Sequence, residues 1–202
     1  MNPARLVVLI SGSGTNLQAI LDACANGRLP ARVVAVVSNK GDAYGLQRAA
    51  KAGVPTLVLP KPKAQDRAEY DAQLAQQVAA FQPDWIVLAG WMRLLTNAFL
   101  SRFPGKVINL HPALPGTFPG THAIQHAYEA YQAGQIDHTG VMVHLVPDEG
   151  VDDGPLLASV PVPIHADDSL ETLEARIHAA EHDLLVETLA RVLLEPDFSR
   201  KD

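Results

Sequence analysis

The chain has almost no cysteine, because Cys24 is the only one among its 202 residues. A single thiol excludes an intramolecular disulfide framework and is typical of a reducing compartment, so we expect a cytoplasmic protein. No apolar run reaches about 18 residues, which argues against a transmembrane helix. The short apolar stretch near the start is followed by polar, glycine-rich sequence, unlike a secretory signal.

Positive charge is also scarce. Sixteen Lys and Arg residues face 22 Asp and Glu residues, for a formal net charge of −6. This balance argues against nucleic acid or an anionic membrane surface as a partner. It leaves room for a small anionic ligand, which a local group of backbone N–H donors can hold. With 48% apolar and 19% charged residues, no repeat and no linker, the chain reads as one globular domain over residues 1–202.

Apolar runs alternate with helical patterns along the first 110 residues. Continuous apolar runs are typical of strands buried on both faces, and their alternation with helices indicates a doubly wound, mostly parallel sheet of the Rossmann-like α/β class. The expected strands are residues 5–10, 32–37, 56–59, 85–88 and 107–110, and the expected helices are 17–25, 45–52, 66–81 and 94–103. A helix at 123–133, strands at 139–146 and 156–161 that can be antiparallel, and a long helix at 170–194 complete the pattern.

A glycine-rich turn, SGSGTN at residues 11–16, joins the first strand to the first helix. Glycines let the backbone approach an anion, and a helix N-terminus offers free N–H groups, so Gly14, Thr15 and Asn16 are candidate phosphate ligands. The alternative is a plain turn in which Thr15 or Asn16 caps the helix. Position 17 is leucine rather than the third glycine of a dinucleotide fingerprint, and the second strand ends without the acid that would bind ribose. The pattern favours a sugar phosphate over NAD.

Asn109 and His111 lie two residues apart at the end of an apolar strand, so both side chains point to the same side of the sheet. Asp152 follows some forty residues later in a turn, Val-Asp-Asp-Gly-Pro. An amide donor, an imidazole and a carboxylate can stabilise an oxyanion and move a proton. The alternatives are side chains that cap local backbone and an aspartate that serves only its turn.

Two histidine pairs have helical spacing, His122/His126 and His178/His182. Neither has a Glu-bearing motif, a cysteine cluster or a third ligand nearby, so we expect no metal site.

In order along the chain, several motifs resemble those of the folate-dependent glycinamide ribonucleotide formyltransferases. They are LISGSGTNLQ from residue 9, SNK from residue 38, AYGL from residue 43, LAGWMR from residue 88, NLHP from residue 109 and AEH from residue 180. The resemblance covers nearly the whole chain.

This resemblance implies transfer of a formyl group from 10-formyltetrahydrofolate to the amine of glycinamide ribonucleotide, in purine synthesis, without a metal. It implies a catalytic triad of Asn109, His111 and Asp152. A protonated His111, kept cationic by Asp152, would stabilise the formyl oxygen together with Asn109. The other residues carried over are Gly14, Thr15, Asn16 and Glu181 for the ribonucleotide, Arg67, Met92, Arg93, Leu94 and Leu95 for the folate, and His122 and His144 as accessory histidines. The N-terminal half would then bind the ribonucleotide, and the C-terminal half would supply the folate and catalytic loops.

Two loops depart from the expected pattern. The loop after His111 reads PALPGTFPG where the family has PSLLP before an aromatic-Pro-Gly. The loop between His144 and Asp152 is one residue longer than usual, which leaves Asp153 as a competitor for the third catalytic position; the Val-Asp-x-Gly-Pro context favours Asp152.

Three other functions compete with this interpretation. A formyltetrahydrofolate hydrolase shares the fold and the triad but has an added N-terminal domain, for which a first strand at residue 5 leaves no room. A transfer-RNA formyltransferase would need a basic C-terminal domain. A non-catalytic nucleotide-binding module would use only residues 12–16, and nothing would then bring Asn109, His111 and Asp152 together. The partners expected are small molecules, and the sequence does not distinguish a monomer from a homodimer.

Overall fold

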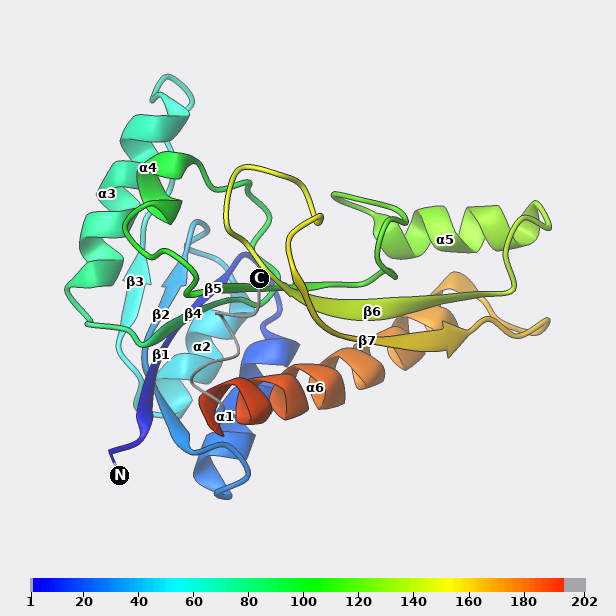
Figure 1. Ribbon diagram of the computed structural model, residues 1–202, viewed down its shortest axis with the longest axis horizontal. Helices are drawn as coiled ribbons and strands as arrows, with labels where there is room; N and C mark the ends of the chain where they lie inside the picture. Colours follow the sequence, from blue (N-terminus) through cyan, green and yellow to red (C-terminus); the bar gives the residue numbers. More distant parts are fainter. Residues whose placement is uncertain (1, 195–202) are drawn as a thin grey trace.

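The computed structural model describes residues 2–194, so Met1 and the last eight residues of the expected domain lie outside the described part. Within it the strands form one seven-stranded sheet in the order β3-β2-β1-β4-β5-β6-β7 (Figure 1). The strands are β1 (Ala4–Ile10), β2 (Ala31–Ser38), β3 (Thr56–Val58), β4 (Trp85–Leu88), β5 (Val107–His111), β6 (His138–Leu145) and β7 (Leu156–Pro163). β1 to β5 pair in parallel, whereas β6 pairs antiparallel with both β5 and β7. The predicted mostly parallel α/β sheet is confirmed.

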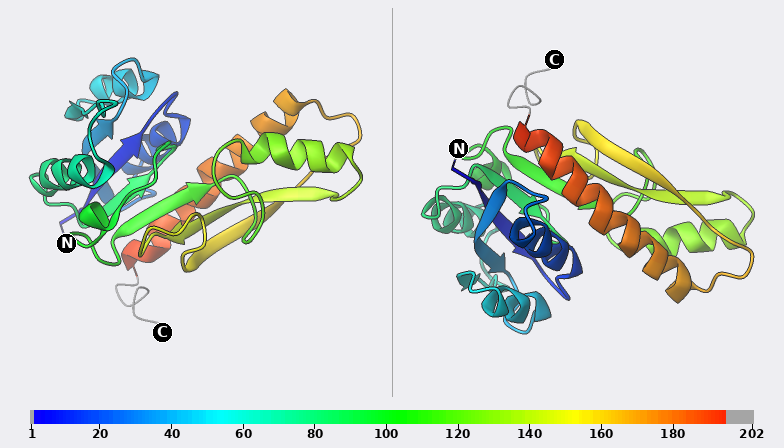
Figure 2. Two further views of the ribbon diagram at one scale, coloured as in Figure 1. Left: turned by 90° about the horizontal axis from the view of Figure 1, so that it is seen from above. Right: turned by 90° about the horizontal axis from the view of Figure 1, so that it is seen from below.

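Helices cover both faces of the sheet, and each face has its own core. The helices are α1 (Thr15–Ala25), α2 (Tyr44–Lys51), α3 (Arg67–Ala79), α4 (Asn97–Leu100), α5 (Ala123–Gln132) and α6 (Leu170–Leu194). Alternate residues of β1 divide between the cores: Leu6, Val8 and Ile10 pack with α1 and α6, whereas Val7 and Leu9 pack with α3 and α4. Figure 2 shows α6 running beside α1. No helix within residues 2–194 is long and apolar enough to cross a membrane.

The helix predicted at residues 94–103 is wrong in extent, because only α4, four residues long, is helical there. Leu95, Phe99 and Phe103 are buried at helical spacing, which explains the prediction. The backbone before α4 is extended at Thr96, whose N–H donates to the buried Asp71 carboxylate at 2.6 Å. This contact starts the helix late and leaves residues 92–95 as an irregular segment.

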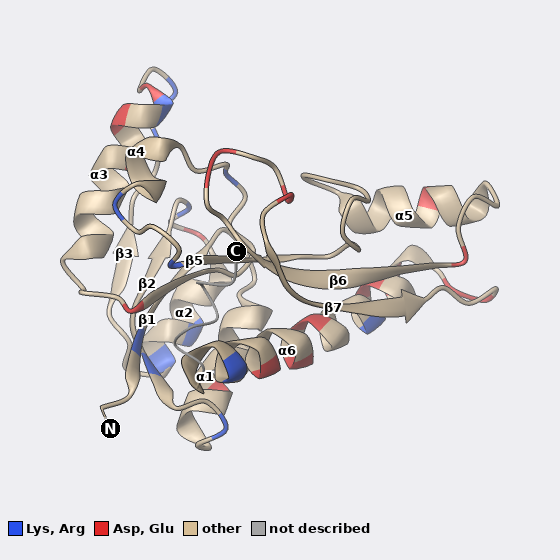
Figure 3. Cartoon of the chain, viewed as in Figure 1, with Lys and Arg blue, Asp and Glu red and all other residues tan. Residues whose placement is uncertain are grey.

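The strand order reverses between β1 and β4, the point where open α/β sheets bind ligands beyond the carboxyl ends of their strands. The glycine-rich turn follows β1 here, residues 89–96 follow β4, and His111 ends β5. The loop between β6 and β7 arches over the same region (Figure 1) and carries four acidic residues (Figure 3). The glycine-rich turn, the segment after β4, the end of β5 and the loop that carries Asp152 thus meet at one edge of the sheet.

Candidate active site

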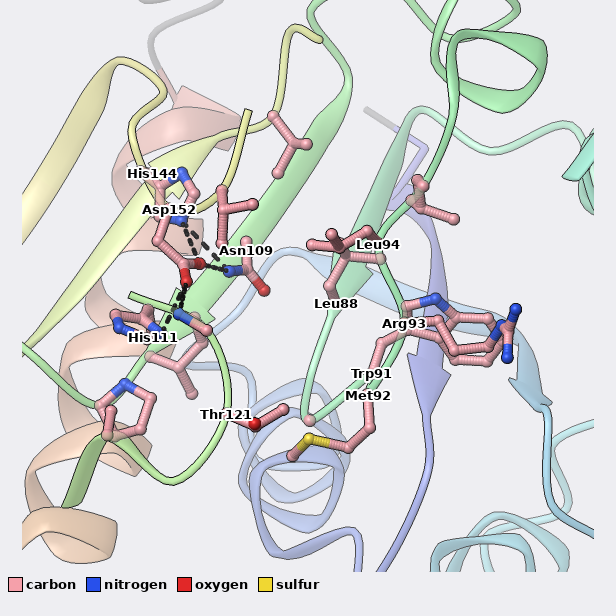
Figure 4. A pocket seen from close by; sticks show the side chains of 18 of the residues that line it. Leu88, Trp91, Met92, Arg93, Leu94, Asn109, His111, Thr121, His144 and Asp152 are labelled. Atoms are coloured by element: carbon pink, nitrogen blue, oxygen red, sulfur yellow. Dashed lines mark hydrogen bonds and ion pairs between the residues drawn. The ribbon is translucent and has the colours of Figure 1, made fainter. Parts of the chain in front are cut away.

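Asn109, His111 and Asp152 form one cluster at the end of β5 (Figure 4). Asn109 Nδ2 donates to Asp152 Oδ1 at 3.0 Å, and His111 Nδ1 lies 3.3 Å from Asp152 Oδ2. Ile108 and Leu110 pack into the opposite core, so the two polar residues share the other face of the strand, as their spacing predicts. The predicted convergence of these three side chains is confirmed, and Asp152 rather than Asp153 lies in the cluster.

His144 completes the environment of Asn109. It stands directly opposite Asn109 in the antiparallel pair of β5 and β6, and its Nε2 lies 3.1 Å from Asn109 Nδ2. Its Nδ1 lies 2.8 Å from the Leu145 carbonyl oxygen, which can only accept, so Nδ1 carries a hydrogen, and its Nε2 also lies 3.5 Å from Asp152 Oδ1. Asn109 Nδ2 thus lies within hydrogen-bonding distance of both Asp152 and His144, and the amide oxygen turns away from Asp152 (Figure 4).

His111 has an oxygen facing each ring nitrogen. Its Nε2 lies 3.0 Å from the Phe118 carbonyl oxygen, and its Nδ1 faces Asp152. Burial lowers the pKa of His111 below its ordinary value, although Asp152 and the Phe118 carbonyl act in the opposite direction. Burial thus opposes the effect of Asp152 on His111, and the expectation that Asp152 keeps this ring cationic stays a prediction. When the His111 ring takes up a second proton, that proton can lie between Nδ1 and the Asp152 carboxylate.

Asp152 is ionised at neutral pH. Burial opposes its charge, but contacts with the His144 ring and the Gly120 N–H, which donates to Oδ2 at 2.8 Å, hold the pKa of the carboxyl below its ordinary value. Asp152, Phe118 and His122 all have positive φ, at 55°, 44° and 62°. Three of the four non-glycine residues with positive φ in the described chain therefore lie at this cluster. Such strained backbone is characteristic of functional sites.

The cluster lines a cavity of about 300 Å³ whose opposite wall is apolar. Leu88, Met92 and Leu94 face it across the space in Figure 4. Met92 and Leu94 are 60% and 48% exposed, an apolar surface open to a ligand.

The other predicted folate residues behave differently. Leu95 is buried in this wall. The Arg93 guanidinium turns away from the cavity and stacks 5.1 Å from the Tyr70 ring centroid. Arg67 lies outside the cavity lining, where its Nη2 is 3.5 Å from the Leu94 carbonyl oxygen.

A second cavity, of about 460 Å³, lies over the glycine-rich turn. Gly14 is the N-cap of α1 with φ 70°, so its backbone adopts a conformation that favours glycine. A Cβ on Gly14 would lie 2.6 Å from Gly45 Cα, which shows how closely α2 packs on the turn. The alternative in which Thr15 or Asn16 caps the helix is wrong, since both residues lie within α1. The N–H groups at the start of α1 can therefore receive an anion.

Glu181 of α6 lines this second cavity and is only 4% exposed. Its Oε2 accepts from Asn16 Nδ2 at 3.1 Å and lies 2.7 Å from His178 Nδ1. Asn16 Oδ1 is buried and has no partner within the described residues, so it can accept a hydrogen bond from a ligand.

Comparison with known proteins decides the family. Residues 4–189 match the family model described as formyl transferase. The chain belongs to the formyl transferase family. It is 50% identical to a phosphoribosylglycinamide formyltransferase of Schizosaccharomyces pombe, with 95% of this chain and 98% of that protein covered. It is 44% identical to the Escherichia coli protein of that name, with 88% and 82% covered.

Solved structures of similar proteins have the same fold. The phosphoribosylglycinamide formyltransferase of Bacillus halodurans superposes with a TM-score of 0.88 at 37% identity, covering 98% of this chain and all of that one. A glycinamide ribonucleotide transformylase from Geobacillus kaustophilus has a TM-score of 0.87 at 43% identity. The expected formyltransferase fold is confirmed.

The histidines at the site differ in which cavity or side chains they contact. His122 lines both cavities, and His144 belongs to the cluster around Asp152. His178 was not among the predicted site residues, although its spacing of three from Glu181 on a helix was a usable signal. Glu181 raises the pKa of His178, which lines the second cavity, and so favours the charged form of this ring. Within residues 2–194, no group of three His, Cys, Asp or Glu side chains is arranged to hold a metal ion.

Proposed function

We propose that the protein transfers the formyl group of 10-formyltetrahydrofolate to the amine of glycinamide ribonucleotide, giving formylglycinamide ribonucleotide. One observation carries this proposal: the two cavities adjoin. They share lining residues, so a ligand in one reaches a ligand in the other. The shared residues are Gly90, Met92, Leu110, Pro112, His122 and Ala123. A site that joins an anion-binding turn to an acid–base cluster suits a two-substrate transfer.

The formyl donor fits the smaller cavity. Its flat heterocyclic ring is a ligand for the apolar wall formed by Leu88, Trp91 and Leu94, and its formyl carbon would lie at the Asp152 cluster. The ribonucleotide fits the larger one, with its phosphate at the N-terminus of α1 and its hydroxyl groups toward Glu181. Both halves of the chain contribute to each cavity.

The residues of the cluster can manage the charge and the proton of this reaction. The amine nitrogen forms a bond to the formyl carbon, the bond from that carbon to N10 breaks, the amine loses a proton and N10 gains one. Neutral His111 beside ionised Asp152 can accept the proton at Nδ1, where the carboxylate stabilises it. The resulting imidazolium and an Asn109 N–H would stabilise the negative charge on the formyl oxygen. His111 then returns the proton to N10.

Consumption of the formyl donor by purified protein, with and without glycinamide ribonucleotide, tests the proposal. We expect consumption that depends on the ribonucleotide and saturates with it. Equal consumption in its absence would support the hydrolase instead, and no consumption at all would support the nucleotide-binding module. Relatives named as formyltransferases over nearly the full chain favour the transfer. The cytoplasmic location and the monomeric or homodimeric state expected from the sequence stay predictions.

A further inference from the structure

The start of α4 is held by two carboxylates that come from different parts of the chain. Asp71 of α3, which is buried, accepts from the Thr96 N–H at 2.6 Å. Glu149, from the exposed loop between β6 and β7, accepts from the Asn97 N–H at 2.8 Å. These are consecutive backbone amides at the N-terminus of a helix, where N–H groups lack helical partners and negative charge is favourable. Nothing in the proposed chemistry uses Glu149.

The position of this contact relates it to the active site. Asn97 follows directly after residues 92–95, the apolar wall of the smaller cavity, and Glu149 stands three residues before Asp152. Glu149 thus joins the two walls between which the formyl donor would bind. Figure 1 shows the loop between β6 and β7 arching toward the segment that precedes α4.

The loop needs such support. Its internal hydrogen bond, from the Gly150 N–H to Asp148 Oδ1 at 2.9 Å, shapes the tip but does not anchor it to the sheet. Asp152 has φ 55°, a conformation that costs free energy and persists only where surrounding contacts hold it. Two sets of contacts join the middle of the loop to the rest of the described protein and hold this strained residue. They are the contacts of Asp152 itself and the one from Glu149.

We propose that Glu149 is a positioning residue that fixes the loop carrying Asp152 to the apolar wall of the formyl-donor cavity. This inference rests on the proposed function. Loss of the contact leaves Asp152 less often in its strained position, and it loosens one wall of the cavity. Both effects fall on the formyl donor and on the chemical step, because the ribonucleotide cavity has no lining residue between positions 126 and 173.

The test compares Glu149→Ala with Glu149→Gln, whose amide oxygen can accept the same N–H. A control, Glu187→Ala, removes an exposed glutamate of α6 far from both cavities. With both substrates varied, we expect Glu149→Ala to lower kcat/KM for the formyl donor about tenfold, the size of one net hydrogen bond, with KM for the ribonucleotide unchanged. Glu149→Gln should keep most of the parent value, and Glu187→Ala all of it.

Parent kinetics in Glu149→Ala, an equal rise in KM for both substrates, or an equal loss in Glu149→Gln would each overturn the assignment. Hydrogen exchange gives a readout that does not need activity. The Asn97 amide and residues 148–153 should exchange faster in Glu149→Ala than in the parent or in Glu149→Gln. If the parent shows no transfer, the proposed function fails, whereas unchanged exchange in Glu149→Ala refutes the contact itself.

Discussion

Replacement of Asp152 by Asn tests the cluster most sharply. Asn has the shape of Asp and tolerates the positive φ at this position, so the backbone can persist. The substitution removes the charge that faces His111 Nδ1 at 3.3 Å. Asp152 also accepts on both oxygens, from Asn109 at 3.0 Å and from the Gly120 N–H at 2.8 Å. An amide offers one oxygen, so its NH₂ group must face one of these donors.

Two magnitudes follow from this geometry. One buried donor left without an acceptor costs about 1–3 kcal/mol of folding free energy, which leaves the protein folded. Loss of the acid–base partner should lower kcat about 10²–10⁴-fold, or roughly 3–5 kcal/mol in the barrier. The assay is steady-state formyl transfer, with thermal unfolding as the check on folding.

Asp153→Asn is the matched control, because this aspartate is adjacent, exposed and outside the cavity lining. We expect its kcat within about threefold of the parent, the range of a surface change that leaves the machinery intact. A folded Asp152→Asn protein with kcat within tenfold of the parent would refute the role of Asp152. So would an equal loss in Asp153→Asn.

Three further predictions concern the two cavities. Glu181 raises the pKa of His178 above its unfolded value near 6.5. The pair therefore stabilises the fold fully below that pH and loses this contribution as the pH rises through the raised pKa. Urea unfolding of His178→Gln should accordingly differ more from the parent at about pH 6 than at about pH 9. Gly14→Ala should cost about 1–3 kcal/mol and raise KM for the ribonucleotide, since its Cβ meets Gly45 at 2.6 Å, whereas Gly27→Ala, also at positive φ but in open space, should leave that KM unchanged. Nitrogen NMR of the free protein should find His111 neutral at about pH 7, because burial lowers its pKa; an imidazolium there would contradict this.

The sheet was predictable from the sequence because its central strands are buried on both faces and read as unbroken apolar runs. Their alternation with helices then indicated a doubly wound, mostly parallel sheet. The exception, residues 94–103, shows the limit of periodicity. Leu95, Phe99 and Phe103 have helical spacing, but the carboxylate of Asp71, distant in sequence, takes the Thr96 N–H and delays the helix.

The site was predictable in part. The spacing of Asn109 and His111 on one strand placed them together from local geometry alone. The role of Asp152 was predictable only from the family resemblance, because no local sequence pattern shows that its loop returns across the sheet. Phe118 acts through its carbonyl, which every residue has, and Glu149 is one exposed acid among several in its loop. Their roles arise from contacts between distant segments, which a single sequence does not reveal.

Formyl transfer is tested most directly by NMR that follows a ¹³C-labelled formyl group from 10-formyltetrahydrofolate in the presence of the protein and glycinamide ribonucleotide. We expect the label to move to the amide of formylglycinamide ribonucleotide, in step with loss of the donor and with no accumulation of labelled formate. Release of the label as formate, with the ribonucleotide unchanged, would contradict it.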